Sequence, residues 1–339
     1  YSTAFLHAWM DVEMYMRPPK VVSQGKRRFL WRLRRALYGV RHSPRLFYHH
    51  LRRMMMQLDV QPLEREPNLF QRGGDHPLLV VVYVDDIIVA GAEADVNKFF
   101  EEMNKEMCLK RGQTLEEGQW TKFVGALYQR TPEGFKVKLP EGYYANIIDE
   151  LGFTGAKSVS TPALVDIRPT TSEEKLMWDE ALTRHETFQF RRIVGKLRWA
   201  APYRPDLLYA VLMISKEMSS PTFASWVRAK RIGRYLIDTI DYELLLPAVN
   251  SEPLVLKLIS DSDYAADRIS RKSISCGVIQ LGGPVETGSL LHGHARQQSI
   301  VATSSAEAEF YAMASITAEG LGVAAAIREM GIEFRIELC

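Results

Sequence analysis

Two adjacent carboxylates between two strongly apolar runs constrain this chain more than any other feature of its sequence. Asp85 and Asp86 stand between residues 78–82 and residues 87–91, and both runs are rich in β-branched side chains. This pattern predicts a β-hairpin with buried arms and the two aspartates at its turn. Like charges beside a buried sheet are costly unless cations neutralise them. The turn is therefore a candidate site for divalent metal ions, and an ordinary acidic hairpin turn is the alternative.

A strongly basic stretch precedes the aspartate pair. The formal net charge of the chain is only +2, yet no acidic residue occurs between Lys20 and Asp59. The cations of this stretch are Lys26, Arg27, Arg28, Arg32, Arg34, Arg35, Arg41, Arg45, Arg52 and Arg53. A solvated basic surface is the usual interpretation of such a run. Because it lies just before a candidate metal site, a path for nucleic acid or triphosphate is the better interpretation.

Cysteine and histidine patterns exclude some classes of protein. The three cysteines, Cys108, Cys276 and Cys339, form no closely spaced pair, which argues against a disulfide framework and a zinc ribbon. We assign His292 and His294 to a polar loop, since two imidazoles without a third ligand rarely form a metal site. No apolar run reaches the length of a membrane span and the N-terminus has no secretory pattern, so we expect no membrane partner.

Helical patterns flank the predicted hairpin. Ser43 is suited to cap a helix that has Pro44 at its first position. Apolar residues then recur at helical spacing, at Phe47, Leu51, Met54 and Leu58. This helix is expected to pack beneath the carboxylate hairpin, with residues 54–56, all methionine, in the core. A second amphipathic helix is predicted over residues 95–107.

Residues 165–250 have the pattern of a largely helical connector. Its basic side chains, Arg228, Lys230, Arg231 and Arg234, form a stripe that could follow a nucleic-acid backbone or face solvent. Residues 247–253 are polar with a proline at each end. Such a segment is typical of a domain boundary.

Past this boundary, the pattern alternates between strand and helix. A strand over residues 254–259 is expected to bring Asp261 to its carboxyl end, and a second strand to cover about residues 274–281. A long helix follows, capped by Ser304 or Ser305, with Glu307 and Glu309 in its first turns. The alternative role for these glutamates is to complement the helix dipole.

Several ordered motifs carry a resemblance to a known family. Tyr83-Val84-Asp85-Asp86 between apolar strands resembles reverse transcriptases, and Ala36–Arg45 resembles the upstream segment in copia-type LTR retrotransposons. Further matches follow in the same order: Phe123-Val124-Gly125, Ser160-Thr161-Pro162, Arg192–Leu197, Arg204-Pro205-Asp206, Ala229–Leu236, Ser260–Ala265 and Ser304–Phe310. Any one match is weak, but so many in order make chance a poor explanation.

The resemblance implies a fold class and a domain order. It implies an α+β chain in which a polymerase palm and thumb-like region is followed by a helical connector and a partial ribonuclease H-like α/β domain. Residues 1–164 would form the reverse transcriptase region with most of its fingers missing, 165–250 the connector, and 251–339 the ribonuclease H-like domain, truncated at its C-terminus.

The resemblance also implies roles for individual residues. The metal-binding catalytic carboxylates would be Asp85 and Asp86 in the palm, and Asp261 and Glu309, rather than Glu307, in the nuclease. Substrate-binding residues would be Phe5, Gly39, Arg41, Pro44 and Tyr83. Nucleic-acid-binding residues would be Arg32, Arg34, Arg35, Arg45 and Gly125. Phe5 matches the steric gate that excludes a 2′-hydroxyl, with a core aromatic as the alternative, and a structural turn is the alternative for Gly125.

These roles imply RNA-directed DNA synthesis and hydrolysis of the RNA strand of a hybrid. The cofactor would be Mg²⁺ in two-metal sites, with Mn²⁺ as a substitute. The partners would be an RNA template, a DNA primer, the RNA–DNA hybrid and deoxynucleoside triphosphates, in an intracellular setting, either a cytoplasmic particle or the nucleus. The family's first palm carboxylate would precede Tyr1 and its third nuclease carboxylate would follow Cys339, so we expect the polypeptide alone to be inactive. A non-catalytic nucleic-acid-binding remnant is the alternative.

Overall fold

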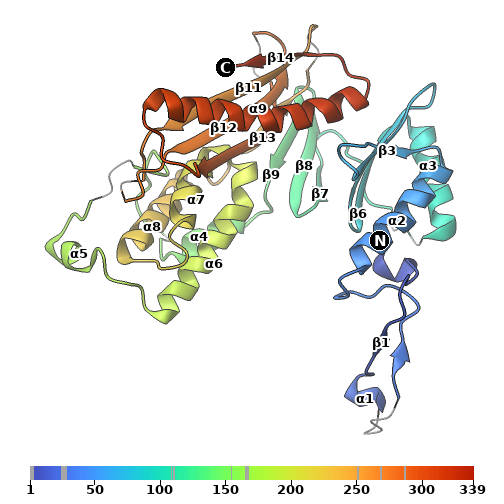
Figure 1. Ribbon diagram of the computed structural model, residues 1–339, viewed down its shortest axis with the longest axis horizontal. Helices are drawn as coiled ribbons and strands as arrows, with labels where there is room; N and C mark the ends of the chain where they lie inside the picture. The colour runs from blue at the N-terminus through green and yellow to red at the C-terminus, as the bar shows by residue number, and fades with distance from the viewer. Residues whose placement is uncertain are drawn as a thin grey trace. The chain divides into compact units, whose positions relative to one another are not determined.

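The computed structural model describes residues 4–23, 29–107, 109, 111–153, 155–164, 168–249, 252–267, 269–285 and 288–339. Cys108 and three cations of the basic stretch, Lys26, Arg27 and Arg28, lie outside these residues. The chain mixes helices with several sheets (Figure 1). It divides into two compact units: unit 1, residues 1–114 and 325–332, and unit 2, residues 115–324 and 333–339. The three-part domain division made from the sequence stays a prediction.

Unit 1 contains one four-stranded antiparallel sheet with two long helices. Its elements are η1 (Ala4–His7), β1 (Tyr15–Met16), α1 (Lys20–Ser23), β2 (Trp31–Arg32), α2 (Ser43–Gln57), β3 (Gln61–Pro62), β4 (Leu69–Arg72), β5 (Leu78–Tyr83), β6 (Asp86–Gly91) and α3 (Glu93–Glu106). The sheet order is β3-β4-β5-β6. Val80 and Val82 of β5 share one core with Phe47 and Leu51 of α2 and with Phe99 of α3, so the predicted packing of α2 beneath the hairpin is confirmed.

Three local predictions in unit 1 were wrong. Ser43 is the first residue of α2 rather than its cap, because its hydroxyl donates to the carbonyl of Leu37 (2.6 Å) and is buried. Strand β6 has no fully buried residue, so only the β5 arm of the hairpin is a core strand. Met56 is 43% exposed, since it lies on the outer face of the helix that buries Met54 and Met55.

Unit 2 begins with a second antiparallel sheet packed against helices. Its elements are β7 (Trp120–Phe123), β8 (Ala126–Thr131), β9 (Gly134–Lys138), α4 (Tyr143–Glu150), α5 (Ser172–Met177), α6 (Arg184–Ala200), η2 (Ala201–Tyr203), η3 (Pro205–Leu207), α7 (Leu208–Ser215), α8 (Phe223–Asp238) and β10 (Leu244–Pro247). The sheet order is β10-β9-β8-β7. Residues 126 and 137 of this sheet share one buried core with α4, α6, α7 and α8.

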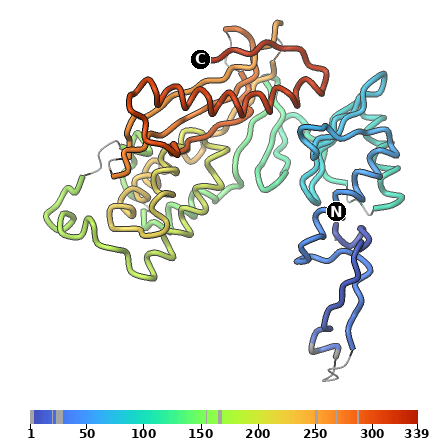
Figure 2. Tube along the Cα trace, in the orientation of Figure 1, coloured from blue at the N-terminus to red at the C-terminus, as the bar shows by residue number. Residues whose placement is uncertain are grey.

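The last part of unit 2 is a four-stranded mixed sheet with a long helix, of which residues 325–329 belong to unit 1. Its elements are β11 (Val255–Asp263), β12 (Ile274–Gly282), β13 (Ser289–Gln297), α9 (Ser305–Glu329) and β14 (Arg335–Leu338). The order is β13-β12-β11-β14, and β14 runs parallel to β11. A Cβ at Gly320 would lie 2.4 Å from Cδ2 of Leu258, so α9 packs closely against β11 (Figure 2).

In this sheet two predictions need correction and one strand was missed. Strand β11 continues through Asp263, so Asp261 lies inside the strand rather than past its end. Strand β13 was not predicted, because its polar side chains hide its strand pattern. His292 and His294 therefore belong to a strand and not to a polar loop.

Among the helices of the described residues, α9 alone is long and apolar enough, by length and composition, to cross a membrane. The prediction that no run reaches such a length was wrong, because alanines together with isoleucine, leucine and valine keep the mean hydropathy of this helix high between few charges. The mostly buried core helix of a soluble protein passes the same test, whereas 28% of the apolar window of α9 is buried. Its contact with β11 at Gly320 shows that one face of α9 packs on the sheet.

Candidate functional site

The turn of the β5–β6 hairpin presents the aspartate pair. Tyr83 pairs with Asp86 at the end of the ladder, which leaves Val84 and Asp85 as the two turn residues. Asp85 thus lies in the turn, whereas Asp86 begins β6, and both are exposed. Val84 has a φ of +52°, a conformation that β-branched residues rarely adopt. A backbone conformation of this kind costs on the order of 1–3 kcal/mol, and such strain clusters at functional sites.

These carboxylates fit a divalent cation by their chemistry. Mg²⁺ prefers hard oxygen ligands and is often bound through one or two carboxylates. Asp85 and Asp86 supply two such groups on neighbouring residues at an exposed turn. Both residues would hold the metal.

Phe5 lies in an aromatic cluster of unit 1. Its ring centroid is 4.6 Å from that of Tyr38 and 5.8 Å from that of Phe47. Phe5 is half-buried against the core, while Tyr38 is 51% exposed. The cluster joins η1, the segment before α2, and α2 itself. From the sequence, Tyr38 is one of the aromatics interleaved with the basic stretch, for which core packing is favoured over stacking on bases.

Gly39 lies in the tight turn from Leu37 to Val40. The amide of Val40 donates to the carbonyl of Leu37 (3.1 Å), and Gly39 has a φ of +90°. A glycine with positive φ at this third position is the signature of a type II turn. Arg41 and Pro44 are exposed just beyond the turn. Gly39, Arg41 and Pro44 therefore lie on one continuous stretch of chain. Phe5 lies on η1, and its ring contacts this stretch at Tyr38. Tyr83 lies elsewhere, at the end of β5.

The predicted nucleic-acid-binding arginines are exposed but partly engaged. Arg32 lies 3.7 Å from a carboxylate oxygen of Glu13, and Arg45 makes an ion pair with Asp11. The guanidinium of Arg35 lies 3.7 Å from the centroid of the Trp9 ring. Arg34 is also exposed. Acidic residues before Lys20 therefore offset part of the charge of the basic stretch.

Gly125 lies in the turn between β7 and β8. Phe123 pairs with Ala126, so Val124 and Gly125 are the two turn residues, with φ of +46° and +82°. Positive φ at both positions matches a type I′ hairpin. A Cβ at residue 125 would lie 3.1 Å from Cζ2 of Trp199. The structural turn role is therefore present, and the contact with a primer stays a prediction.

Asp261 and Glu309 lie near the same end of the C-terminal sheet. Asp261 pairs with Cys276 on β12. Next to this pair, Gln298 donates to the Ser275 hydroxyl (2.9 Å) and to the Ala308 carbonyl (2.8 Å). The first turns of α9, which include Glu309, are thereby fixed at the Asp261 end of the sheet.

The register nevertheless directs Asp261 away from α9. Side chains alternate between the faces of a strand, and Leu258 of β11 faces α9 at Gly320. Odd-numbered residues of β11 face the other way, as the hydrogen bond from the Tyr209 hydroxyl on α7 to Asp263 (3.1 Å) indicates. A metal ion shared by Asp261 and Glu309 would have to lie at the end of the sheet rather than over either face.

The acidic residues at the Asp261 end of the sheet differ in their hydrogen bonds and in their effect on neighbouring pKa values. Burial, followed by the charges of Asp261 and Asp263, raises the pKa of Cys276. Glu307 accepts hydrogen bonds from the Thr303 hydroxyl and amide, which lower its pKa. Because Glu307 is engaged at the helix start, Glu309 is the better candidate ligand.

One matched motif has a structural role that the sequence did not indicate. Arg204 is 3% exposed and donates to both carboxylate oxygens of Asp206, at 2.9 and 2.7 Å. It also donates to the Thr239 carbonyl (2.8 Å). The Arg-Pro-Asp motif is thus an ion pair between a buried guanidinium and a partly exposed carboxylate, and it joins η3 to the end of α8.

Comparison with known proteins gives consistent matches. The sequence model of the reverse transcriptase (RNA-dependent DNA polymerase) family matches residues 1–165. The retrovirus-related Pol polyprotein from transposon RE2 of Arabidopsis thaliana is 29% identical, over 98% of this chain and 22% of its own length. The corresponding polyprotein from transposon TNT 1-94 of Nicotiana tabacum is 27% identical, over 98% of this chain and 24% of its own length. The chain spans less than a quarter of the length of either relative.

Proposed function

We propose that this chain carries the catalytic turn of an RNA-directed DNA polymerase, because the reverse transcriptase family model matches residues 1–165 and nearly the whole chain is similar to copia-type retrotransposon Pol polyproteins. The observation that supports this most is the strained β5–β6 turn, which exposes Asp85 and Asp86 beside each other. Its partners would be an RNA template, a DNA primer and deoxynucleoside triphosphates.

In this proposal each residue has a defined task. Asp85 and Asp86 hold Mg²⁺, or Mn²⁺ in its place. A divalent cation there would make the primer hydroxyl a better nucleophile and stabilise charge on the triphosphate. Phe5, held against Tyr38, lies under the incoming sugar and excludes a 2′-hydroxyl. Gly39 and Gly125 allow close approach of nucleic acid, since neither carries a side chain.

Primer extension tests the polymerase assignment. Asp85→Asn, in the protein expressed together with its neighbouring Pol sequence, should lower extension on an RNA template by at least about 10²-fold, because a metal ligand is lost. Asp75→Asn is a matched control, since Asp75 is an exposed aspartate in the turn between β4 and β5, and it should leave extension unchanged. Persistence of extension in Asp85→Asn would reject the assignment. Salt-dependent binding of nucleic acid by a wild type that cannot extend would instead favour a non-catalytic binding protein.

We infer a second activity, ribonuclease H, for the β11–α9 region. It is supported by the bonds of Gln298, which hold the start of α9 at the Asp261 end of the sheet. The substrate would be the RNA strand of an RNA–DNA hybrid, cleaved with the help of Mg²⁺ bound by Asp261 and Glu309. In the protein expressed together with the Pol sequence that follows it, Glu309→Gln should abolish hybrid cleavage, whereas Glu307→Gln should retain it. Equal cleavage by wild type and Glu309→Gln would remove Glu309 from the site.

A further inference from the structure

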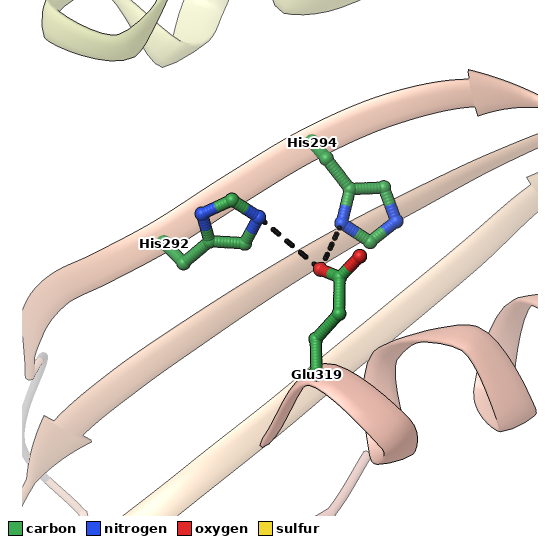
Figure 3. A group of neighbouring side chains, drawn as sticks. All are labelled: His292, His294 and Glu319. Atoms are coloured by element: carbon green, nitrogen blue, oxygen red, sulfur yellow. Dashed lines mark ion pairs between the residues drawn. The ribbon is translucent and has the colours of Figure 1, made fainter. Parts of the chain in front are cut away.

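Two histidines and a glutamate converge between β13 and α9 (Figure 3). Nε2 of His292 lies 3.1 Å from Oε2 of Glu319, and Nδ1 of His294 lies 2.9 Å from the same oxygen. His292 and His294 are two residues apart on one strand, so both side chains point to the face that α9 covers. Three groups that can bind a metal ion thus meet at one oxygen of Glu319.

The polar atoms at this point meet through ion-pair contacts rather than through hydrogen bonds of standard geometry. His294 is 7% exposed, and among the described residues neither of its ring nitrogens has a hydrogen-bond partner, nor has Oε2 of Glu319. The close contact between Nδ1 and Oε2 therefore does not have hydrogen-bond geometry. Buried polar atoms without a hydrogen bond are costly, so a ligand held by all three groups would stabilise the cluster.

The surroundings hold these side chains in place. A Cβ at Gly277 would lie 2.7 Å from Cε1 of His294, so the imidazole fits only because residue 277 has no side chain. Arg296 makes an ion pair with Oε1, the other oxygen of Glu319. This leaves Oε2 for the two histidines. A charged partner on the outer oxygen of a ligating carboxylate is a common arrangement around protein metal sites.

We propose that Nε2 of His292, Nδ1 of His294 and Oε2 of Glu319 form a zinc site, with water as the fourth ligand. Two imidazoles and one carboxylate are a donor set that Zn²⁺ binds in proteins, whereas Mg²⁺ prefers oxygen ligands alone. Ligand atoms about 2.0–2.1 Å from a tetrahedral ion lie about 3.3 Å apart. The separations of 2.9 and 3.1 Å need only a slight opening to reach this value. The half-exposed side chain of His292, 43% accessible, leaves solvent access for the ion and the water.

This site is separate from the proposed nuclease residues. His294 pairs across the sheet with Gly277, which contacts Ile316 of α9. Asp261 belongs to the opposite face. Zinc would therefore link β13 to α9 without occupying the position of the nuclease metal, and the proposal does not depend on either enzymatic activity.

Zinc binding by the whole chain tests the proposal. Isothermal titration with Zn²⁺ should give one site, and the Kd should rise at least tenfold in His292→Gln and in Glu319→Gln. His185→Gln is the matched control, because His185 is an exposed histidine on α6, and its Kd should equal that of the wild type. Co²⁺ should give the intense visible absorption of a tetrahedral site in the wild type alone.

His292→Gln and Glu319→Gln separate metal binding from folding. His292 is exposed and Glu319→Gln preserves shape, whereas substitution of the buried His294 could disturb the sheet. Near-ultraviolet circular dichroism without metal should be the same for all four proteins. Absence of stoichiometric Zn²⁺ binding, or an unchanged Kd in both His292→Gln and Glu319→Gln, would overturn the proposal and leave the cluster as an ion-pair network.

Discussion

Gly39 has the left-handed backbone required by the turn from Leu37 to Val40. A Cβ added at this position would meet no atom within 4 Å, so Gly39→Ala isolates the backbone cost. We expect the free energy of unfolding to fall by about 1–2 kcal/mol, measured by urea denaturation. Gly73→Ala is the control, because that glycine is equally uncrowded but does not have a left-handed φ. Equal losses in both variants would show that the turn geometry is not responsible.

The aspartate turn shows how far single residues could be predicted. The two arms and the position of the turn follow from two apolar, β-branched runs with two aspartates between them, which is local information. The positive φ of Val84 does not follow, because the intrinsic preference of a β-branched residue opposes it. Ser43 was misassigned for a related reason. A serine before a proline suits a helix cap, but its hydroxyl is used instead by the turn at Leu37.

At the scale of elements, the ion pair of Arg204 and Asp206 ties η3 to α8. Arg204→Lys should lower the free energy of unfolding by about 3 kcal/mol, because lysine cannot reproduce the bidentate contact and leaves a buried charge poorly paired. Urea denaturation measures the change. Arg184→Lys, at an exposed position on α6, should change it by less than about 0.5 kcal/mol. A small loss at Arg204 would mean that water or another group replaces the lost contacts.

Elements with an apolar face were predictable, and elements held by tertiary contacts were not. Helices α2 and α3 and strand β12 have apolar residues at the right period, so the sequence predicts them closely. Strand β13 places two histidines against α9, where Glu319 approaches them. No local pattern signals this partner, which lies far along the chain. The face of the sheet that Asp261 occupies was likewise not predictable, because it depends on the pleat of β11.

At the scale of the whole molecule, stability should depend on alkaline pH through four tyrosines of unit 2. Burial raises the pKa of Tyr128, Tyr143, Tyr144 and Tyr209 to about 12. In the unfolded chain a tyrosine titrates near about 10. The folded pKa is the higher one, so the unfolded chain loses its protons first as pH rises. The stabilisation is complete below about pH 10 and is lost between about pH 10 and pH 12.

Urea denaturation across this range, with tyrosinate absorbance as a second readout, measures the effect. Tyr143→Phe is the informative variant, because it keeps the ring and removes only the hydroxyl that donates to the Lys196 carbonyl (2.8 Å). It should be less stable than the wild type near pH 8, where that hydrogen bond is intact. It should also lose less stability between about pH 10 and pH 12, because one fewer buried phenol resists ionisation. If wild type and Tyr143→Phe lose stability in parallel over this range, ionisation of Tyr143 does not contribute, and the alkaline loss must come from the other buried tyrosines.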